Sequence, residues 1–214
     1  MTGDSCETND DWASPLTCQC GVCGDSYGDI VCSVQPILVD LGGAGLSLTS
    51  AQNGIKFDSF RSGRLIQMAW TTAGADVGWL ALDRNGNGRI DDGAELFSNV
   101  TPQPRPGPRS GFRALAVYDQ PANGGNGDGV IDQRDSVFSR LRVWVDKNHN
   151  GVTEPGELLT MQQAGIQSIS LDYKLAKWVD AYGNQFLYRS KITFANGVPA
   201  GDQYVYDVLL GTAK

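Results

Sequence analysis

Short apolar runs separated by glycine-rich turns make up most of the chain from residue 34 onward. Such runs are typical of β-strands, half-buried where apolar and polar positions alternate and fully buried where they do not. In 186–194, for example, apolar side chains fall on one face and basic ones on the other. The predicted strands are 36–40, 46–48 paired with 55–57, 65–70, 79–82, 142–145, 166–173, 186–194 and its antiparallel partner 203–210.

Three other segments carry helical signals. In the first two, apolar side chains recur at helical spacing, as at Val137 and Leu141. The third begins with Pro155, and proline is favoured in the first turn of a helix. The predicted helices are 110–118, 135–141 and 155–163. The pattern therefore predicts an α+β fold, in which short helices pack on antiparallel or mixed β elements.

The cysteines divide the chain in two. All five precede residue 33, and none follows. We therefore expect a small cysteine-rich module over 1–33 and a main domain over 34–214. Thiolates of the module could hold zinc, or they could form two disulfides with one thiol left free. The main domain, described below, has the features of an extracellular protein, and this favours disulfides. Spacing alone does not decide the pairing among Cys6, Cys18, Cys20, Cys23 and Cys32.

Charge and composition exclude several function classes. The 214 residues include 24 acidic and 17 basic side chains, a net charge of −7, which argues against nucleic acid as a partner. A single histidine, His149, leaves no Ser-His-Asp or Cys-His catalytic set and no histidine-rich zinc site. No apolar run is long enough for a membrane span, and the polar start of the chain does not resemble a signal peptide.

Three acidic segments have the ligand spacing of an EF-hand calcium loop. Such a loop supplies side-chain oxygens at positions 1, 3, 5 and 9, a backbone carbonyl at position 7 and an acid at position 12. A glycine at position 6 permits the sharp bend. We call the three segments loop 1 (83–95), loop 2 (124–135) and loop 3 (146–157).

Loop 3 matches the spacing at every position. Its expected ligands are Asp146, Asn148, Asn150, the Val152 carbonyl, Glu154 and Glu157. Loop 1 matches through position 9, but its glutamate falls at position 13, which one bulged residue would correct. Its expected ligands are Asp83, Asn85, Asn87, the Arg89 carbonyl, Asp91 and Glu95.

Loop 2 lacks an oxygen ligand at position 1, because Gly124 stands there. Asp119 fills this place if 120–125 loop out, and Asn123 is a weaker alternative. The other expected ligands are Asn126, Asp128, the Val130 carbonyl, Asp132 and Asp135.

The alternative to calcium sites is that these segments are simple Asn-Gly and Asp-Gly turns between strands. Three turns, each followed by acids at later ligand positions, make that interpretation hard to sustain. Two segments upstream, 40–45 and 58–63, keep the first aspartate and the bend glycine but lose the oxygens between them, so we expect no metal there. His149 stands at position 4 of loop 3, where side chains point outward, and we expect it to be solvated.

Several parts of the chain resemble a bacterial module of large secreted calcium-binding proteins and of the self-processing region of iron-regulated RTX proteins. The resemblance extends over 34–175. It is strongest in the sequence of 80–97 and in Val143-Trp144 followed by loop 3. It implies secretion, calcium binding by EF-hand-like loops and folding triggered by extracellular calcium.

The resemblance also implies an activity: the self-processing relatives cleave an Asp-Pro bond at the start of the module. There the aspartate carboxylate attacks its own carbonyl, and the new end can link to a lysine. Here Gln35 precedes Pro36, and an amide is a poor nucleophile.

We therefore expect a secreted, non-enzymatic calcium-binding protein, ordered by about three Ca²⁺ ions. The alternatives are a structural subunit of an extracellular assembly cross-linked through the cysteine module, a calcium-dependent self-processing module that has lost its aspartate, and a hydrolase using an unlocated carboxylate pair. Self-association or binding of an extracellular protein would accompany the first of these alternatives.

Overall fold

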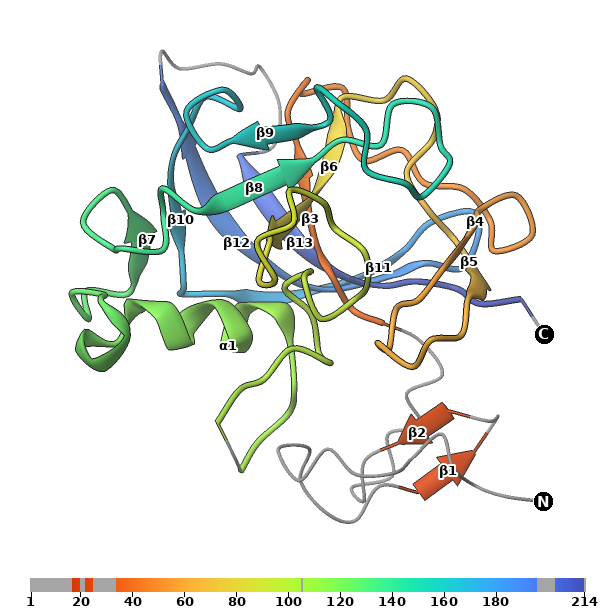
Figure 1. The fold of residues 1–214 in the computed structure, drawn as a ribbon, viewed down its shortest axis with the longest axis horizontal. Coiled ribbons are helices and arrows are strands. Elements are labelled where there is room, and N and C mark those ends of the chain that lie inside the picture. Colours follow the sequence, from red (N-terminus) through yellow and green to blue (C-terminus); the bar gives the residue numbers. More distant parts are fainter. Residues whose placement is uncertain (1–16, 20–21, 25–33, 105, 196–202, 214) are drawn as a thin grey trace.

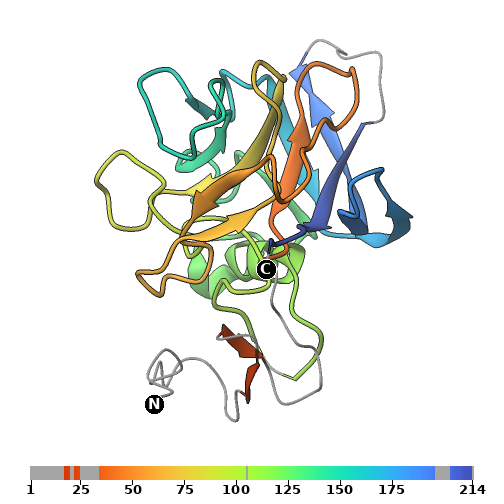
Figure 2. The same cartoon turned by 90° about the vertical axis from the view of Figure 1, so that its right-hand side faces the viewer.

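One large antiparallel sheet dominates the computed structural model, which describes residues 17–19, 22–24, 34–104, 106–195 and 203–213. Its strands follow the order β7-β10-β12-β13-β3-β6-β8-β9, and β11 also pairs with β12. The sheet is strongly curled (Figures 1 and 2). The strands are β3 (Ile37–Asp40), β6 (Val77–Leu82), β7 (Val130–Asp132), β8 (Leu141–Trp144), β9 (Leu158–Thr160), β10 (Ile166–Ser170), β11 (Lys174–Val179), β12 (Gln185–Phe194) and β13 (Tyr204–Leu209).

Two smaller sheets have two strands each. β4 (Ile55–Phe57) pairs with β5 (Ile66–Met68), and β1 (Thr17–Gln19) pairs with β2 (Val22–Gly24). The predicted zinc site or disulfides of the cysteine-rich segment concern side chains outside the described part of the chain.

Hydrophobic clusters cover both faces of the central strands. Trp70, Trp79 and Trp144 form the centre of a first cluster, with ring centroids 4.8 to 5.5 Å apart. Leu80 and Phe112 belong to a second cluster. Because the two clusters take alternate residues of β6, all six residues of this strand are buried. This arrangement explains why the central strands are continuous apolar runs in the sequence.

The predicted α+β fold is wrong, because the described residues are nearly all β. They contain one short α-helix, α1 (Gly111–Ala116), capped by Ser110, and two 3₁₀ turns, η2 (Val117–Asp119) and η3 (Pro121–Asn123). The helix is the part of the helical prediction that the structure confirms.

The other two segments with helical signals form a strand and a series of turns instead. The predicted helix 155–163 instead contains β9, whose Leu158 and Leu159 lie opposite Trp144 and Val143. The predicted helix 135–141 forms only consecutive turns before Leu141 enters β8. Hydrogen bonds to β8 satisfy the backbone of β9, and turn hydrogen bonds such as Phe138 N–H to the Asp135 carbonyl satisfy much of the backbone before Leu141.

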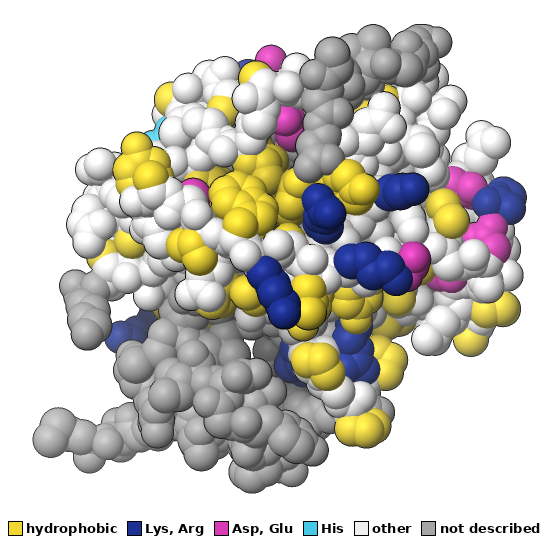
Figure 3. Space-filling model, turned by 180° about the vertical axis from the view of Figure 1, so that it is seen from behind, with side chains coloured by type: hydrophobic (Ala, Val, Ile, Leu, Met, Phe, Trp, Pro, Cys, Tyr) yellow, Lys and Arg dark blue, Asp and Glu magenta, His cyan; other side chains and the backbone are white. Residues whose placement is uncertain are grey.

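Most predicted strands are confirmed, but 46–48 forms no strand, and β7 lies in a segment predicted only as loop 2. β4 pairs with β5 rather than with 46–48, and Leu48 instead forms a bridge with Thr71. β11 was not predicted, because most of its side chains are exposed and show no apolar alternation. Figure 3 shows Lys and Arg side chains gathered beside hydrophobic ones on the back of the molecule, so the net negative charge is unevenly distributed.

Candidate functional site: three acidic loops

Loops 1 and 3 are hairpin loops of the large sheet. Loop 1 follows β6 and returns to it, because Leu82 N–H donates to the Glu95 carbonyl at 2.8 Å and Leu96 bridges Ala81. Loop 3 joins β8 to β9, and Val145 N–H donates to the Glu157 carbonyl at 2.9 Å. β6 precedes loop 1, and β8 and β9 flank loop 3, in places where an EF-hand would have helices; bonds to the sheet fix the ends of both loops.

The first aspartate of each loop accepts hydrogen bonds from backbone N–H groups at the bend. Each carboxylate uses both oxygens, so the bend is held against the start of the loop. The bonds run from Gly86 and Gly88 to Asp83 at 2.7 and 2.8 Å, from Gly127 and Gly129 to Asp119 at 3.0 and 2.9 Å, and from Asn150 and Gly151 to Asp146 at 3.1 and 2.8 Å.

The last acid of each loop is buried and also accepts at least two backbone N–H groups. One donor lies near the start of the loop and the other is the residue at position 9. The bonds run from Arg84 and Asp91 to Glu95, both at 2.9 Å, from Asn126 and Asp132 to Asp135 at 3.2 and 2.8 Å, and from Lys147 and Glu154 to Glu157 at 2.9 and 3.1 Å. Glu95 thus takes the same place as Glu157 despite the extra residue in loop 1.

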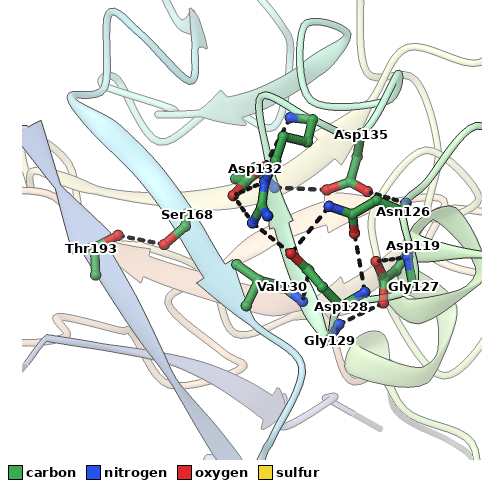
Figure 4. A network of polar contacts seen from close by, with 11 residues as sticks. Asp119, Asn126, Gly127, Asp128, Gly129, Val130, Asp132, Asp135, Ser168 and Thr193 are labelled. Carbon is green, nitrogen blue, oxygen red and sulfur yellow. Dashed lines mark hydrogen bonds and ion pairs between the residues drawn. The ribbon is translucent and has the colours of Figure 1, made fainter.

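Asp119 stands at the first position of loop 2, where the sequence left two candidates open. Residues 120–125 loop out around η3, and this brings Asp119 against the bend (Figure 4). The Asn123 side chain instead donates to the Val117 carbonyl at 2.8 Å. The structure therefore brings Asp119, rather than Asn123, together with the other residues of this loop.

Side chains at positions 3, 5 and 9 also converge in loops 1 and 3. Two asparagine amides reach the same position-9 carboxylate in each loop, so these oxygen-bearing groups surround one point. The contacts run from Asn85 and Asn87 to Asp91 at 3.3 and 2.5 Å and from Asn148 and Asn150 to Glu154 at 2.6 and 3.3 Å.

Loop 2 holds a basic side chain among its acids, which the sequence analysis missed. The Arg134 guanidinium lies 2.5 Å from a carboxylate oxygen of Asp128 and 2.6 Å from one of Asp132. Hydrogen bonding to Arg134 holds the pKa of the Asp132 carboxyl below its usual range. An intramolecular cation therefore already neutralises part of the charge of this loop.

Loop 3 is anchored to the first hydrophobic cluster. The indole N–H of Trp70 donates to the Asp146 carboxylate at 2.8 Å, in a buried contact. The ring nitrogens of His149 lie 2.5 Å from the Thr71 carbonyl oxygen and 2.9 Å from that of Asn53. His149 is therefore half-buried and held by two backbone carbonyls, where free solvation was expected. Both contacts join residues far apart in the chain, so the loop pattern carried no signal of them.

The two upstream segments fold in the same way as the starts of the three loops. Asp40 accepts from the N–H groups of Gly43 and Gly45, both at 2.8 Å, and Asp58 accepts from Gly63 at 2.7 Å. They lack the later acids, and that they bind no metal stays a prediction.

The donor set of the three loops consists of oxygens, as a hard cation such as Ca²⁺ requires. Within the described ranges, no group of three or more His, Cys, Asp and Glu side chains is placed to hold a metal. An ion in these loops would therefore depend on asparagine and backbone oxygens as well as carboxylates. No helix in the described part of the chain is long and apolar enough to cross a membrane.

Comparison with known proteins identifies related sequences. A family model, the SPM domain, matches residues 37–210, which include all three loops. Over 169 residues, 78% of the chain, the sequence is 36% identical to the iron-regulated protein FrpA of Neisseria meningitidis serogroup C. The chain covers 14% of the length of that protein. The similarity agrees with the resemblance to iron-regulated RTX proteins that the sequence analysis found.

Proposed function

Because this chain belongs to the SPM domain family, we propose that it is a secreted module in which each of the three acidic loops binds one Ca²⁺ ion, and that the ions order the fold. The observation that carries the proposal is the hydrogen-bond frame shared by the loops. In all three, the first aspartate holds the bend and the last acid holds the N–H group at position 9.

Each loop offers carboxylate and amide oxygens to one ion. Asp83, Asn85, Asn87, Asp91 and Glu95 would hold the ion of loop 1, with the Arg89 carbonyl. Asp119, Asn126, Asp128, Asp132 and Asp135 would hold that of loop 2, with the Val130 carbonyl. Asp146, Asn148, Asn150, Glu154 and Glu157 would hold that of loop 3, with the Val152 carbonyl. The ion would neutralise acids that otherwise repel one another.

Counting bound metal tests this function. Equilibrium dialysis against millimolar calcium, followed by metal analysis, should find close to three ions per chain. The same measurement on a variant with Asp83→Ala, Asp119→Ala and Asp146→Ala should find close to none. A wild-type protein that retains two ions or fewer would contradict the proposal.

We further propose that the chain is not an enzyme, and we expect no self-cleavage before Pro36 when calcium is added. Gln35 N–H donates to the Asn99 side chain at 2.8 Å, and the Pro36 carbonyl accepts from Val208 at 3.0 Å, so the bond is held at the start of β3. The Gln35 amide is neutral and resonance-stabilised, and it lacks the nucleophilicity of a carboxylate.

Mass spectrometry after long incubation with calcium checks this expectation. The intact mass should not change, and a Gln35→Asp variant tested in parallel shows whether the side chain alone prevents cleavage. A wild-type fragment that begins at Pro36 would show that the chain is a self-processing enzyme.

Removing the basic side chain from loop 2 should strengthen calcium binding there. Arg134 holds Asp128 and Asp132, and an ion must compete with it for these carboxylates. Because Arg134 is exposed, we expect Arg134→Gln to lower the loop 2 dissociation constant by only about two- to fivefold. Calorimetric titration measures this dissociation constant. Arg140→Gln removes the same positive charge outside the loop and serves as the control. An equal effect of both variants would indicate a general effect of net charge instead.

A further inference from the structure

Loops 1 and 3 touch each other at equivalent positions. Ile90 and Thr153 are each the eighth residue of their loop, and they are 63 residues apart in the chain. Ile90 N–H donates to the Thr153 hydroxyl oxygen at 3.0 Å, and this hydroxyl donates to the Ile90 carbonyl at 3.3 Å. Both residues are buried. One hydroxyl therefore satisfies both backbone polar groups of Ile90.

The eighth residue lies directly between two expected ligands in each loop. In loop 1, Ile90 follows the Arg89 carbonyl and precedes Asp91; in loop 3, Thr153 precedes Glu154. Any ordering of these ligands by an ion also orders the residue between them. The bonds between Ile90 and Thr153 would then transmit that order to the other loop.

Both loops also pack on the first hydrophobic cluster. Ile90 is part of it, and Asp146 accepts a hydrogen bond from Trp70, which lies at its centre. Gly151, at the bend of loop 3, has φ +71°, and a Cβ there would lie 2.3 Å from the Ile55 side chain of the same cluster. Neither loop can therefore shift without disturbing packing that supports the other.

Loop 2 has no such contact with the other two loops at its eighth residue. This residue is Ile131, which lies in β7 opposite Ile169 of β10 and belongs to the second hydrophobic cluster. Its backbone is thus held by a strand rather than by another loop.

We propose that loops 1 and 3 bind calcium cooperatively as a pair, coupled through Ile90 and Thr153, and that loop 2 binds calcium independently. This inference rests on the proposed calcium function. The first ion of the pair bears the ordering cost of the shared contact, so the second binds to a loop that is already partly ordered. The coupling is reciprocal, because each loop must change the affinity of the other by the same factor.

A calcium titration followed by nuclear magnetic resonance separates the three sites. The amide signals of Gly88, Gly129 and Gly151 each report the bend of one loop. In the wild-type protein, the signals of Gly88 and Gly151 should change together over the same calcium range, with a Hill coefficient above 1. The Gly129 signal should change independently and without cooperativity.

Two matched variants test the coupling from the ligand side. Glu157→Gln removes the last acid of loop 3 and should raise the calcium concentration that Gly88 requires by about fivefold or more. Asp135→Asn removes the last acid of loop 2 and should change the response of Gly88 by less than twofold.

A second pair of variants tests the contact itself. Thr153→Val keeps the shape of the side chain but removes its hydroxyl, and it should separate the Gly88 and Gly151 transitions and reduce the Hill coefficient to about 1. Thr193→Val removes a hydroxyl that contacts Ser168 rather than another loop, and it should leave the cooperativity unchanged.

The outcomes distinguish the two proposals. If no loop signal responds to calcium, the proposed function fails, and the coupling fails with it. If all three signals respond but Gly88 is unaffected by Glu157→Gln, calcium binding stands and the coupling is wrong. If Thr153→Val retains wild-type cooperativity while Glu157→Gln weakens loop 1, the assignment of the coupling to Ile90 and Thr153 is wrong.

Discussion

Removing calcium with a chelator should lower the melting temperature of this protein by on the order of 20 °C. An ion at about 100 times its dissociation constant stabilises the folded state by about 2.7 kcal/mol, so three sites contribute about 8 kcal/mol. This is comparable to the whole free energy of unfolding of an ordinary domain, about 5–15 kcal/mol. For a chain of this size, each kcal/mol shifts the melting temperature by about 2–4 °C.

We expect this large fall in melting temperature because the loops lie within the fold rather than on a tail. Glu95 and Glu157 lead directly back into the large sheet. Together with Asp135 and Asp146 they are at most 3% exposed, so their charges lie in the interior. Hydrogen bonds from backbone N–H groups compensate these charges in part, and a bound divalent ion would compensate them further.

Differential scanning calorimetry with calcium and with excess chelator measures the effect. A chelator saturated with calcium beforehand serves as the control and should leave the melting temperature unchanged. Magnesium, which prefers a smaller octahedral site, should restore only part of the loss. A melting temperature that does not depend on free calcium would contradict the proposal that the ions order the fold.

Glu157→Gln should reduce the number of bound ions by at least one and cost about 3 kcal/mol of stability at saturating calcium. Loop 3 has an oxygen at every ligand position, and Trp70 anchors its first aspartate, so we expect it to bind calcium most tightly. The substitution replaces a carboxylate, which can bind the ion through two oxygens, with an amide that offers one neutral oxygen. Because positions 3 and 5 are neutral asparagines, the affinities should lie at roughly 10⁻⁵–10⁻³ M.

Calorimetric titration and thermal melts of the variant check this prediction. Asp172→Asn is a suitable control, because it removes an acid that is paired with Lys174 on the surface and belongs to none of the loops. The control should bind three ions with wild-type affinity. If Glu157→Gln does so as well, Glu157 is not a calcium ligand.

The candidate loops could be found from the sequence because their pattern is local. Ligand types, the bend glycine and the final acid of loop 3 all lie within twelve consecutive residues, and the same local hydrogen bonds then form in the structure. The central strands could be found for a similar reason. Burial on both faces requires an uninterrupted apolar run, as in β6.

The fold class was decided only by tertiary structure. Pro155 indicates a helix start at 155–163, yet β9 forms there because β8 offers its free edge and Leu158 and Leu159 pair across it. Such short segments have weak intrinsic preferences, and a neighbouring strand outweighs them.

Contacts between distant residues were likewise beyond local reasoning. Asp119 joins loop 2 only because η3 turns the chain back, and His149 reaches carbonyls of Asn53 and Thr71. Ile90 meets Thr153 across 63 residues of sequence. The sequence by itself determined the frames of loops 1 and 3, because each of these loops closes on its own residues. Which loops lie together was decided by the packing of the sheet, which depends on pairings that no short segment contains.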